Sequence, residues 1–573
     1  MKLREVRIHN YRSIVDVSIQ VHDFTLLVGA NNAGKSTVVN AIRAFYDDLK
    51  WSAEDFPKFG AEDSESWVQL QFQLDDDEWE GLADKYKEGA DGKSLTLRRY
   101  FKAADKVREK TGQSNIFGFI NGAWDTELFY GAKNVGAAKV GQIIYVPALT
   151  TSAEQTKMSG PSPLRNILNF LLKKVVASSD AYRQLATAFK NFNEEARQGS
   201  GFLNEVSTPL NAALASWNIK IDLEINTVAP EDISKSMIGF SFVDSALDNV
   251  GFDLDRYGHG FQRSVIYELI RLAPAFKEKK QGDKKEFSPN FSLMLFEEPE
   301  AFLHPSQQEC MAYHLRRLGA ESCQQVIITT HSPIFAGKAS EQICQIARMQ
   351  RVNGSTKAFQ PKSDDLQSLF EGGGNFLNAL RTFIANPRVP DGEKKRARAM
   401  VIDPPEIHIA EQEEQFRYQL WLDSERASLF FADKVLLVEG ATERALFNYL
   451  LANEWHDLNH RRVYIVDVLG KFNLHRYMLL LKVFGIPHGV MLDDDNRKHH
   501  HGAVNDLIDG SRNWATLAAP VKFPNCLEEF LGLPIPDRDD KKPIEMIKAI
   551  TENRIDEERL RALRASFCSA LGL

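Results

Sequence analysis

The order of apolar and polar positions predicts that the first third of the chain is rich in strands. Apolar residues run together or alternate with polar ones in six short stretches, as they do in strands. These stretches are residues 3–14, 23–30, 67–74, 94–101, 116–120 and 141–149. A helix is expected from about Ser36 to Asp47, after the second stretch. The stretches between residues 67 and 120 are expected to form an antiparallel meander.

The pattern changes to helical periodicity in the next segment. From Pro163 to about Trp217, apolar residues recur every three to four positions, which indicates helices inserted into a strand-rich region. A strand pattern returns at residues 219–230. Two apolar strands at 291–298 and 324–331 then enclose a helix, and this order predicts an α/β fold with a parallel sheet.

A second α/β unit is expected at the C-terminus. Residues 386–430 are rich in charged residues and proline and then become helical, so the junction between the units is placed there. The strands of the second unit are expected at 434–440, 462–468 and 488–496, with helices after the first two. The expected division of the chain is 1–160, 161–220 for the helical insertion, 221–385, 386–430 for the linker and 431–573.

Composition excludes several classes of protein. The 573 residues suffice for two to four domains of about 150 residues each. Lysine and arginine number 70 against 78 aspartate and glutamate, so the net charge of −8 excludes a histone-like polycation but permits a local basic groove. The five cysteines form no Cys-x-x-Cys pair, which argues against a zinc ribbon or a disulfide framework and favours the cytoplasm. No apolar run approaches the roughly 20 residues that span a bilayer, so no membrane association is expected.

A glycine-rich segment between the second strand and the first helix predicts a nucleotide site. Residues 29–37 fit the pattern Gly-x-x-x-x-Gly-Lys-Ser/Thr. In this arrangement backbone N–H groups surround the phosphates, Lys35 reaches the β and γ oxygens, and Ser36 binds Mg²⁺ at the positive end of the helix. The other residues expected to contact the nucleotide here are Asn31, Asn32, Gly34 and Thr37.

Three later segments contain the other candidates for this nucleotide site. Glu297 and Glu298 end an apolar strand, where the first acid can hold the Mg²⁺ shell and the second can orient an attacking water. His331 ends the next strand, in position to contact the γ-phosphate. A Gly-x-Gly turn before a helix supplies the candidates Gly258, Gly260 and Gln262. Each segment alone also suits solvated acids or a structural histidine, but their order favours a nucleotide site.

Acidic residues at strand ends of the C-terminal unit predict a metal site. Glu439 closes a strand and Glu443 lies four residues later on a helix, so both carboxylates can face one ion. Asp493 and Asp495 share one face of a strand. Carboxylates suit Mg²⁺ or Mn²⁺, and two such ions roughly 4 Å apart would clamp a phosphodiester. Solvated surface acids are the alternative, although α/β units bind their ligands at these strand ends.

The order of the nucleotide segments resembles that of the ABC-type ATPases of the SMC and RecF group. The resemblance implies that Glu297 is the Walker B acid, Glu298 the catalytic base and His331 the switch histidine. It also implies that the turn at 258–262 contacts ATP bound to a second protomer, and hence a dimer. The Walker B acid is Glu rather than the commoner Asp and the signature turn lacks its Ser, so slow turnover or a switch role for ATP is expected.

The C-terminal motifs, Glu-Gly-x-x-Glu followed by Asp-x-Asp, resemble those of the Toprim domain. An ABC-type ATPase followed by a Toprim domain, with Phe-Phe-Ala-Asp before the first Toprim strand, resembles the OLD (overcoming lysogenisation defect) family of nucleases tied to phage defence. Gabija nuclease subunits and some retron-associated effectors share this architecture. In the family, the helical insertion mediates dimerisation.

The resemblance to the OLD family implies roles for single residues of the C-terminal unit. The expected metal ligands are Glu439, Glu443, Asp493 and Asp495. A later acid, Glu528 with Glu529 as the rival, is expected to join them. A basic residue, Lys542 in preference to Lys541, would stabilise charge in the transition state. Asp467, in a loop beside the site, stays open as a further ligand.

These patterns together predict a cytoplasmic DNA endonuclease, dimeric or larger, that uses two Mg²⁺ or Mn²⁺ ions in the Toprim unit and binds ATP with one more. ATP is expected to control access or assembly rather than the chemistry. Family analogy leaves a partner defence protein or a retron-derived DNA open as further partners. The alternatives are a topoisomerase-like strand transferase, which needs a tyrosine nucleophile, and a nucleotide-switched DNA sensor or scaffold without nuclease activity.

Two further features of the sequence are open to two interpretations. The histidines at 499–501 predict a loop, with DNA contact as the alternative. Basic clusters at 394–396 and 461–462 suit phosphate contacts or solvated surface equally.

Overall fold

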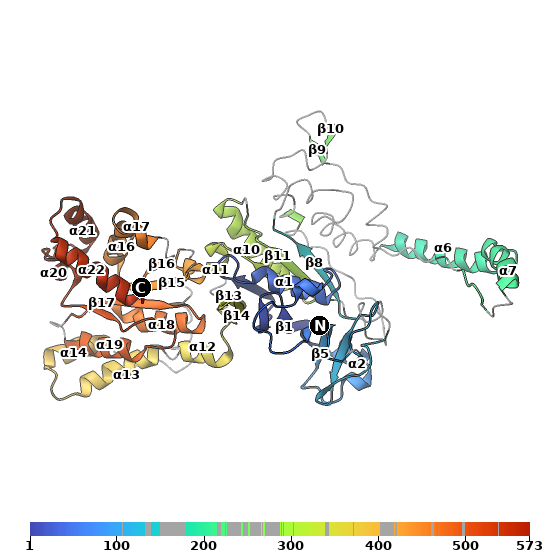
Figure 1. The fold of residues 1–573 in the computed structure, drawn as a ribbon, viewed down its shortest axis with the longest axis horizontal. Coiled ribbons are helices and arrows are strands. Elements are labelled where there is room, and N and C mark those ends of the chain that lie inside the picture. The colour runs from blue at the N-terminus through green and yellow to red at the C-terminus, as the bar shows by residue number, and fades with distance from the viewer. Residues whose placement is uncertain are drawn as a thin grey trace.

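The fold is described from a computed structural model of the chain (Figure 1). The described residues are 1–105, 107–131, 139–148, 179–214, 219–223, 225, 242–244, 250–252, 265, 268–269, 287, 289, 291–301, 303–338, 343–370, 372–400, 417–418, 421–423, 425–459, 463–495, 499–536 and 538–573.

The N-terminal segment forms an antiparallel sheet with the order β2-β1-β4-β5-β6-β7. Its strands are β1 (Lys2–Tyr11), β2 (Ile14–Gln20), β4 (Ser66–Gln73), β5 (Ser94–Lys102), β6 (Ile116–Ile120) and β7 (Ala123–Trp124). The antiparallel pairing of β4, β5 and β6 confirms the predicted meander. The single strand predicted over 3–14 is wrong, because the chain turns near Arg12, where Asn10 and Arg12 have positive φ. The turn is too short to interrupt the apolar pattern, since Tyr11 already pairs with Ile14.

A second sheet carries the predicted nucleotide segments and has the order β14-β13-β3-β12-β11-β8. Its strands are β3 (Phe24–Val28), β8 (Gln142–Val146), β11 (Ser292–Glu297), β12 (Gln324–Thr329), β13 (Ile346–Val352) and β14 (Ser355–Phe359). All neighbours except β13 and β14 are parallel, which confirms the predicted parallel sheet. The carboxyl ends of β3, β11 and β12 therefore meet at one edge.

Short helices surround these two sheets. They are α1 (Lys35–Phe45), α2 (Asp76–Gly81), α10 (Pro305–Gly319), α11 (Pro333–Lys338), η1 (Ala53–Asp55) and η2 (Asp84–Tyr86). A separate pair of short strands is formed by β9 (Phe242–Asp244) and β10 (Val250–Phe252).

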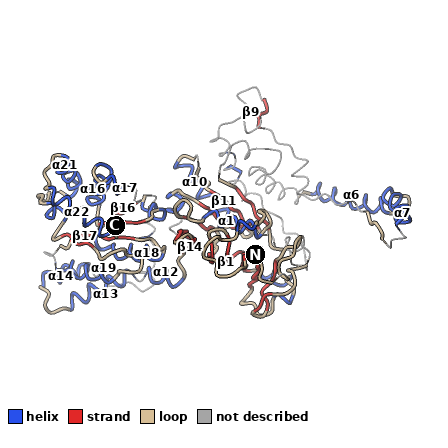
Figure 2. The backbone as a smooth tube through the Cα atoms, viewed as in Figure 1, coloured by secondary structure: helices blue, strands red, loops and turns tan. Residues whose placement is uncertain are grey.

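Two helices of the predicted insertion, α6 (Asp180–Arg197) and α7 (Phe202–Leu214), project away from both sheets (Figures 1 and 2). Residues 163–178 and 215–217 of the predicted helical stretch lie outside the described residues. Of the strand predicted at 219–230, the structure describes 219–223 and 225, and these residues are not in a strand.

The C-terminal unit is built on a parallel sheet with the order β16-β15-β17-β18. Its strands are β15 (Lys434–Val438), β16 (Val463–Asp467), β17 (His488–Asp493) and β18 (Val521–Phe523). Its helices are α16 (Ala441–Asn453), α17 (His456–Asn459), α18 (Leu474–Val483), α19 (His499–Gly510), α20 (Leu527–Leu531), α21 (Lys542–Thr551) and α22 (Glu557–Ala570), with the 3₁₀ turns η8 (Arg426–Phe431), η9 (Lys471–Asn473) and η10 (Asp539–Lys541). The three predicted strands of this unit are present, but β17 ends at Asp493. Asp495, which has a positive φ, therefore does not share a strand face with Asp493 as predicted.

Three helices between the two units lie against the C-terminal one. They are α12 (Ser363–Phe370), α13 (Gly372–Ala385) and α14 (Asp391–Met400). The helix α13 contacts α18 and α19, α12 contacts α18, and α14 contacts α19. Figure 1 shows α13 and α14 beside α19, and α12 between α18 and the β13–β14 end of the nucleotide sheet.

The two parallel sheets share one apolar core. A single cluster of buried side chains contains Leu26 and Ile328 of the first sheet together with Val435 and Val490 of the second. The helix α11 and the turn η8 contact each other between the two sheets. The two units are thus joined by a continuous packed interior. In the part of the chain that the structure describes, no helix combines the length and the apolar character needed to cross a membrane.

Candidate functional site

The glycine-rich segment forms a tight loop between β3 and α1. Gly29 has a φ of 133°, and a Cβ atom there would lie 2.2 Å from the carbonyl oxygen of Met349 on β13. Gly34 has a φ of 104°, and a Cβ atom there would lie 2.4 Å from the hydroxyl of Thr356 on β14. Both positions therefore require glycine. Because the loop backbone lies directly on the β13–β14 hairpin, the hairpin is part of this site, although no sequence motif pointed to it.

Lys35 lies inside this loop and is buried. Its Nζ donates to the carbonyl oxygens of Gly29 at 2.8 Å and Ala30 at 3.0 Å. Burial lowers the pKa of Lys35 to about 8, although the nearby carboxylates of Glu298 and Glu300 oppose this shift. The lysine is thus placed at the end of the parallel sheet where a phosphate would replace its bonds to the loop.

The segments after β11 and β12 bring acidic residues and a histidine to the same edge. The Nε2 atom of His331 lies 3.5 Å from Oε1 of Glu298. The backbone N–H of His331 donates to Oε1 of Glu300 at 2.6 Å. Burial lowers the pKa of His331, and the charge of Lys35 lowers it further. The structure therefore brings together Lys35, Glu298 and His331, as the sequence predicts.

Glu297 and Glu300 have partners that sequence analysis missed. The hydroxyl of Tyr145 on β8 donates to Oε2 of Glu297 at 2.8 Å. Burial raises the pKa of Glu300, which favours its neutral form. Glu300 is the third acid of Glu-Glu-Pro-Glu, and this proximity is the signal that would have revealed it. Tyr145 comes from a strand about 150 residues away, so no local pattern points to it.

The remaining nucleotide candidates differ in what can be said of them. Asn31, Asn32 and Ser36 are exposed at the mouth of the loop, and Thr37 is partly buried on the first turn of α1. The candidates of the Gly-x-Gly turn, Gly258, Gly260 and Gln262, lie outside the described residues.

The acids of the C-terminal unit meet at the carboxyl ends of β15 and β17. Glu439 follows β15 directly, and its Oε1 accepts a hydrogen bond of 2.8 Å from the backbone N–H of Asp493 at the end of β17. Glu443 lies on the first turn of α16, where its Oε2 accepts a hydrogen bond of 3.0 Å from the N–H of Gly440. Adjacent parallel strands thus place acids from positions more than 50 residues apart against each other.

Mutual repulsion and burial make these carboxylates hard to ionise. Burial raises the pKa of Asp493 to about 9, and the charges of Glu439, Glu443, Glu528 and Asp495 add to this effect. Burial likewise raises the pKa of Glu439 to about 7, against the opposing charge of Lys471. Groups with such raised pKa values need a positive charge nearby to ionise together. The four acids named with Asp493 therefore lie close enough to it to oppose its ionisation.

Asp494 and Asp495 point to different surroundings, as expected for adjacent residues after a strand. The side chain of Asn505 on α19 donates to Oδ1 of Asp494 at 2.9 Å. Asp495 has its Oδ2 at 3.3 Å from Nζ of Lys471 and at 2.8 Å from Nδ1 of His501. Asp495 thus belongs to the cluster with Glu439 and Asp493, whereas Asp494 fastens α19. We call Glu439, Glu443, Asp493, Asp495 and Glu528 the carboxylate cluster.

Lys471 provides a positive charge inside the carboxylate cluster. It is 3% exposed and donates to the backbone oxygen of Asp493. Its Nζ also lies 3.9 Å from Oε1 of Glu439. The sequence placed the loop of Lys471 beside the site but did not predict that this side chain enters it.

The structure separates the two rival acids and the two rival lysines. Glu528 is buried, whereas Glu529 accepts a hydrogen bond of 2.8 Å from the side chain of Asn525. Glu528 and Lys542 together line a hollow of about 150 Å³, while Lys541 is exposed. The placement favours Glu528 and Lys542 as the site residues.

Asp467 has structural partners, and the three histidines lie at the start of a helix. Asp467 is buried, with Oδ1 at 2.6 Å from Nη2 of Arg426 and Oδ2 at 2.9 Å from Nη1 of Arg444. Both of its oxygens are engaged by arginine, so Asp467 holds η8 and α16 together. The loop predicted at His499–His501 is wrong, because α19 begins at His499. Partners distant in the sequence thus decide the surroundings of Asp467.

The carboxylate cluster suits a divalent cation by the chemistry of its donors but not by their present spacing. Among the described residues, no three His, Cys, Asp or Glu side chains are grouped closely enough to hold one ion as they stand. The chemistry of the donors nevertheless fits a hard cation, since buried carboxylates that raise each other's pKa require positive charge. Lys471 supplies part of that charge in this arrangement.

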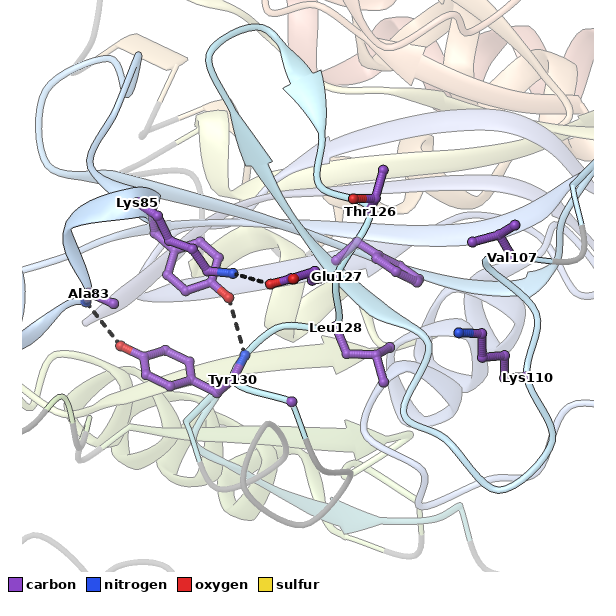
Figure 3. A pocket seen from close by; sticks show the side chains of 11 residues that line it. Ala83, Lys85, Val107, Lys110, Thr126, Glu127, Leu128 and Tyr130 are labelled. Atoms are coloured by element: carbon purple, nitrogen blue, oxygen red, sulfur yellow. Dashed lines mark hydrogen bonds and ion pairs between the residues drawn. The ribbon is translucent and has the colours of Figure 1, made fainter.

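A separate hollow of about 450 Å³ lies on the N-terminal antiparallel sheet (Figure 3). Tyr86, Phe117 and Tyr130 line it, and Nζ of Lys85 lies 3.3 Å from Oε2 of Glu127. The hydroxyl of Tyr130 accepts from the N–H of Ala83, which fixes its wall. None of the residues that line this hollow belongs to the nucleotide or carboxylate site.

Comparison with known proteins identifies both halves of the chain. A family model described as an AAA ATPase domain matches residues 1–116 and 71–336. A model described as the TOPRIM domain of overcoming lysogenization defect-like proteins matches residues 430–495. An N-terminal ATPase half followed by a Toprim half, both of α/β architecture, confirms the predicted fold class.

Similar proteins extend over most of the chain. The Old nuclease of Escherichia phage P2 is 24% identical over 86% of this chain and 77% of its own length. The OLD nuclease of Thermus scotoductus is 22% identical over 86% of this chain and 82% of its own length. Endonuclease GajA of Bacillus cereus is 23% identical over 52% of this chain and 40% of its own length. The chain belongs to the family of AAA ATPase domains, and it is similar over most of its length to nucleases of the OLD family.

The lowered pKa of Lys35 predicts that nucleotide affinity depends on pH. Triphosphate binds the charged lysine, and the charged fraction falls as the pH rises through about 8. We expect the affinity for ATP to fall about tenfold between about pH 7 and about pH 9. Calorimetry in buffers of different ionisation enthalpy should show proton uptake on binding at about pH 8.5 and little at about pH 7. Equal affinities across this range would contradict the assignment of Lys35.

Proposed function

We propose that this protein is an ATP-binding, metal-dependent DNA endonuclease whose cutting site is the carboxylate cluster. The observation that carries the proposal is the convergence of acids from β15, β17 and α20 on one space, where Asp493 has a pKa of about 9. Such crowding of buried carboxylates is costly unless it serves to bind cations. The relatives named as nucleases support the same activity.

The chain's own residues would divide the work of phosphodiester hydrolysis. Glu439, Glu443, Asp493, Asp495 and Glu528 would hold Mg²⁺ or Mn²⁺. Two such ions, when bound, supply an activated water and stabilise the leaving oxygen. Lys542, which lines a hollow with Glu528, would neutralise charge on the phosphate.

The ATPase half would bind ATP with one further Mg²⁺ and regulate cutting. Lys35 and Ser36 would contact the phosphates and the ion, with Glu297 completing the ion's shell. Glu298 would orient the hydrolytic water, since it lies beside His331 at the same sheet edge. The remaining candidates on the turn at 258–262 would reach the nucleotide of a second protomer.

We further propose that the protein acts in defence against phage, as the OLD resemblance implies. The activity on DNA would then be directed at invading DNA, with or without a partner protein or a retron-derived DNA. Plaque counts on cells that express the protein, compared with cells that express Glu439→Ala, measure this role. A strand-transferase alternative would leave protein covalently attached to DNA after denaturation, and no tyrosine lies in the carboxylate cluster among the described residues.

The projecting helices α6 and α7 support a homodimer. Leu185 and Phe192 on α6, and Phe202, Val206 and Leu210 on α7, are each at least 40% exposed. Apolar side chains gathered on a projecting pair of helices suit burial against a second copy. We expect Phe192→Glu to shift the protein to a smaller species in light scattering coupled to size exclusion. Glu194→Lys, on the same helix, serves as the control. An unchanged mass for Phe192→Glu would contradict this interface.

Loss of the Glu439 side chain should abolish DNA cutting without affecting nucleotide binding. We expect Glu439→Ala to reduce nicking of supercoiled plasmid in Mg²⁺ or Mn²⁺ at least about 100-fold, because one proposed metal ligand of the carboxylate cluster is removed. Its affinity for ATP should equal that of the unmodified protein. Lys35→Ala, in contrast, should lose ATP binding. If Glu439→Ala cuts as fast as the unmodified protein, the site is elsewhere.

Two matched pairs test the later site residues. We expect Glu528→Gln and Lys542→Met each to slow nicking at least about 30-fold. The first removes a negative charge from the carboxylate cluster, and the second removes the lysine charge that would neutralise the phosphate. Glu529→Gln and Lys541→Met should cut within about threefold of the unmodified rate, since their side chains lie outside the cluster. Rates are compared at saturating Mn²⁺. A larger loss from Glu529 or Lys541 would reverse the assignment.

A further inference from the structure

The helix α18 connects the two functional sites of the protein. Its N-terminal end follows directly on η9, whose first residue is Lys471 in the carboxylate cluster. Its C-terminal end is Val483, followed by Phe484 and Gly485. Ten helical residues span about 15 Å. Seven of the ten are buried, so the helix is fixed by packing along its length.

Arg348 of the ATPase half holds the C-terminal end of α18. Arg348 lies on β13, is 3% exposed, and its Nη1 donates to the carbonyl oxygens of Phe484 at 3.1 Å and Gly485 at 3.0 Å. A cation at this end of a helix satisfies carbonyl groups that have no partner within the helix. The structure therefore places a buried charge of one half at the end of a helix of the other.

The same arginine also holds the turn η8. Its Nε donates to the carbonyl oxygen of Phe430 at 3.2 Å, and its Nη2 to that of Ala432 at 3.1 Å. Burial lowers the pKa of Arg348 to about 10, so its charge is still retained at neutral pH. The guanidinium thus bridges two segments of the Toprim half through four main-chain oxygens.

Arg348 is adjacent to the nucleotide loop. It pairs in register with Val28, the last residue of β3, and the next residue, Met349, has its carbonyl oxygen against Gly29. A shift of the loop backbone at Gly29 would meet this carbonyl, because no space for even a Cβ atom separates them. Figure 1 shows β13 and β14 on the side of the nucleotide sheet that faces the C-terminal unit.

We propose that Arg348, α18 and Lys471 form a rigid connection through which nucleotide binding at the loop repositions the carboxylate cluster. Arg348 and Lys471 are then positioning residues of the cutting reaction. This inference rests on the proposed nuclease function for its reaction, but the physical connection can be measured without cutting. A shift of the loop moves β13, Arg348 moves the end of α18, and the helix moves Lys471 against Glu439 and Asp495.

Hydrogen exchange on the unmodified protein tests the connection directly. We expect a non-hydrolysable ATP analogue to change exchange at residues 471–486 at least about threefold. Residues 557–570 of α22, which lie on the other side of the C-terminal sheet, should change less than 471–486. Unchanged exchange at 471–486 on saturation with the analogue would overturn the proposal, whether or not the protein cuts DNA.

Variants of Arg348 test its role in the reaction. Arg348→Lys keeps the charge but not the planar fork that reaches four carbonyl oxygens. We expect this variant to bind the analogue within about threefold of the unmodified affinity, while the change that the analogue makes in the nicking rate shrinks at least about fivefold. Arg351→Met is the matched control, because Arg351 lies on the same strand and bonds the carbonyl of Gly354 in its own hairpin. A full nucleotide response in Arg348→Lys would overturn the proposal.

Lys471→Met tests the other end of the helix. Because Lys471 lies inside the cutting site, the readout is hydrogen exchange and not the nicking rate. We expect Lys471→Met to bind the analogue normally and to lose the change that the analogue makes in exchange at residues 436–443, with Lys482→Met on the exposed side of α18 as the control. If the unmodified protein fails to nick DNA, the nuclease proposal fails and the exchange experiment still decides the connection. If it nicks but ignores the analogue, the nuclease proposal stands and the connection is overturned.

Discussion

Buried negative charge is the constraint on which the C-terminal half depends. Carboxylates at the ends of adjacent parallel strands are forced together by the sheet itself, and each makes the others harder to ionise. The structure meets part of this cost with the backbone N–H groups of Gly440 and Asp493 and with Lys471. The part of the electrostatic repulsion that these groups do not compensate raises the pKa values of Asp493 and Glu439. A site kept in this state is prepared for cations.

The nucleotide site also contains a buried ionisable group at the edge of a parallel sheet, but here the group is a cation. This cation is Lys35, and its pKa is lowered. Its own loop carbonyls and the acids Glu298 and Glu300 compensate the charge until an anion arrives. Two sheets of similar construction thus hold opposite charges in readiness for opposite ligands. A shared apolar core keeps the two in fixed relation.

Sequence reasoning succeeded where the signal is local. Periodicity located β3, β11, β12, β15 and β17, and the motif at 29–37 and the acid pairs followed from residues next to these strands. It failed where the partner is distant. The pairing of Asp467 with Arg426 and Arg444, and the entry of Lys471 into the cluster, depend on which strands become neighbours. The choice between Glu528 and Glu529 depends on which side chain is buried, and the sequence of two adjacent glutamates does not reveal this.

The guanidinium of Arg348 has one more consequence, which concerns inheritance rather than chemistry. Its bonds to the C-terminal half go to main-chain oxygens, and therefore depend on the path of that half's backbone and not on its side chains. Side chains around the contact are free to diverge while the backbone path is kept. If either half were exchanged for an unrelated one, the Arg348 guanidinium would lose its main-chain acceptors and the shared apolar core would be exposed to solvent. An exchange of halves would therefore preserve this contact only where the backbone path is kept.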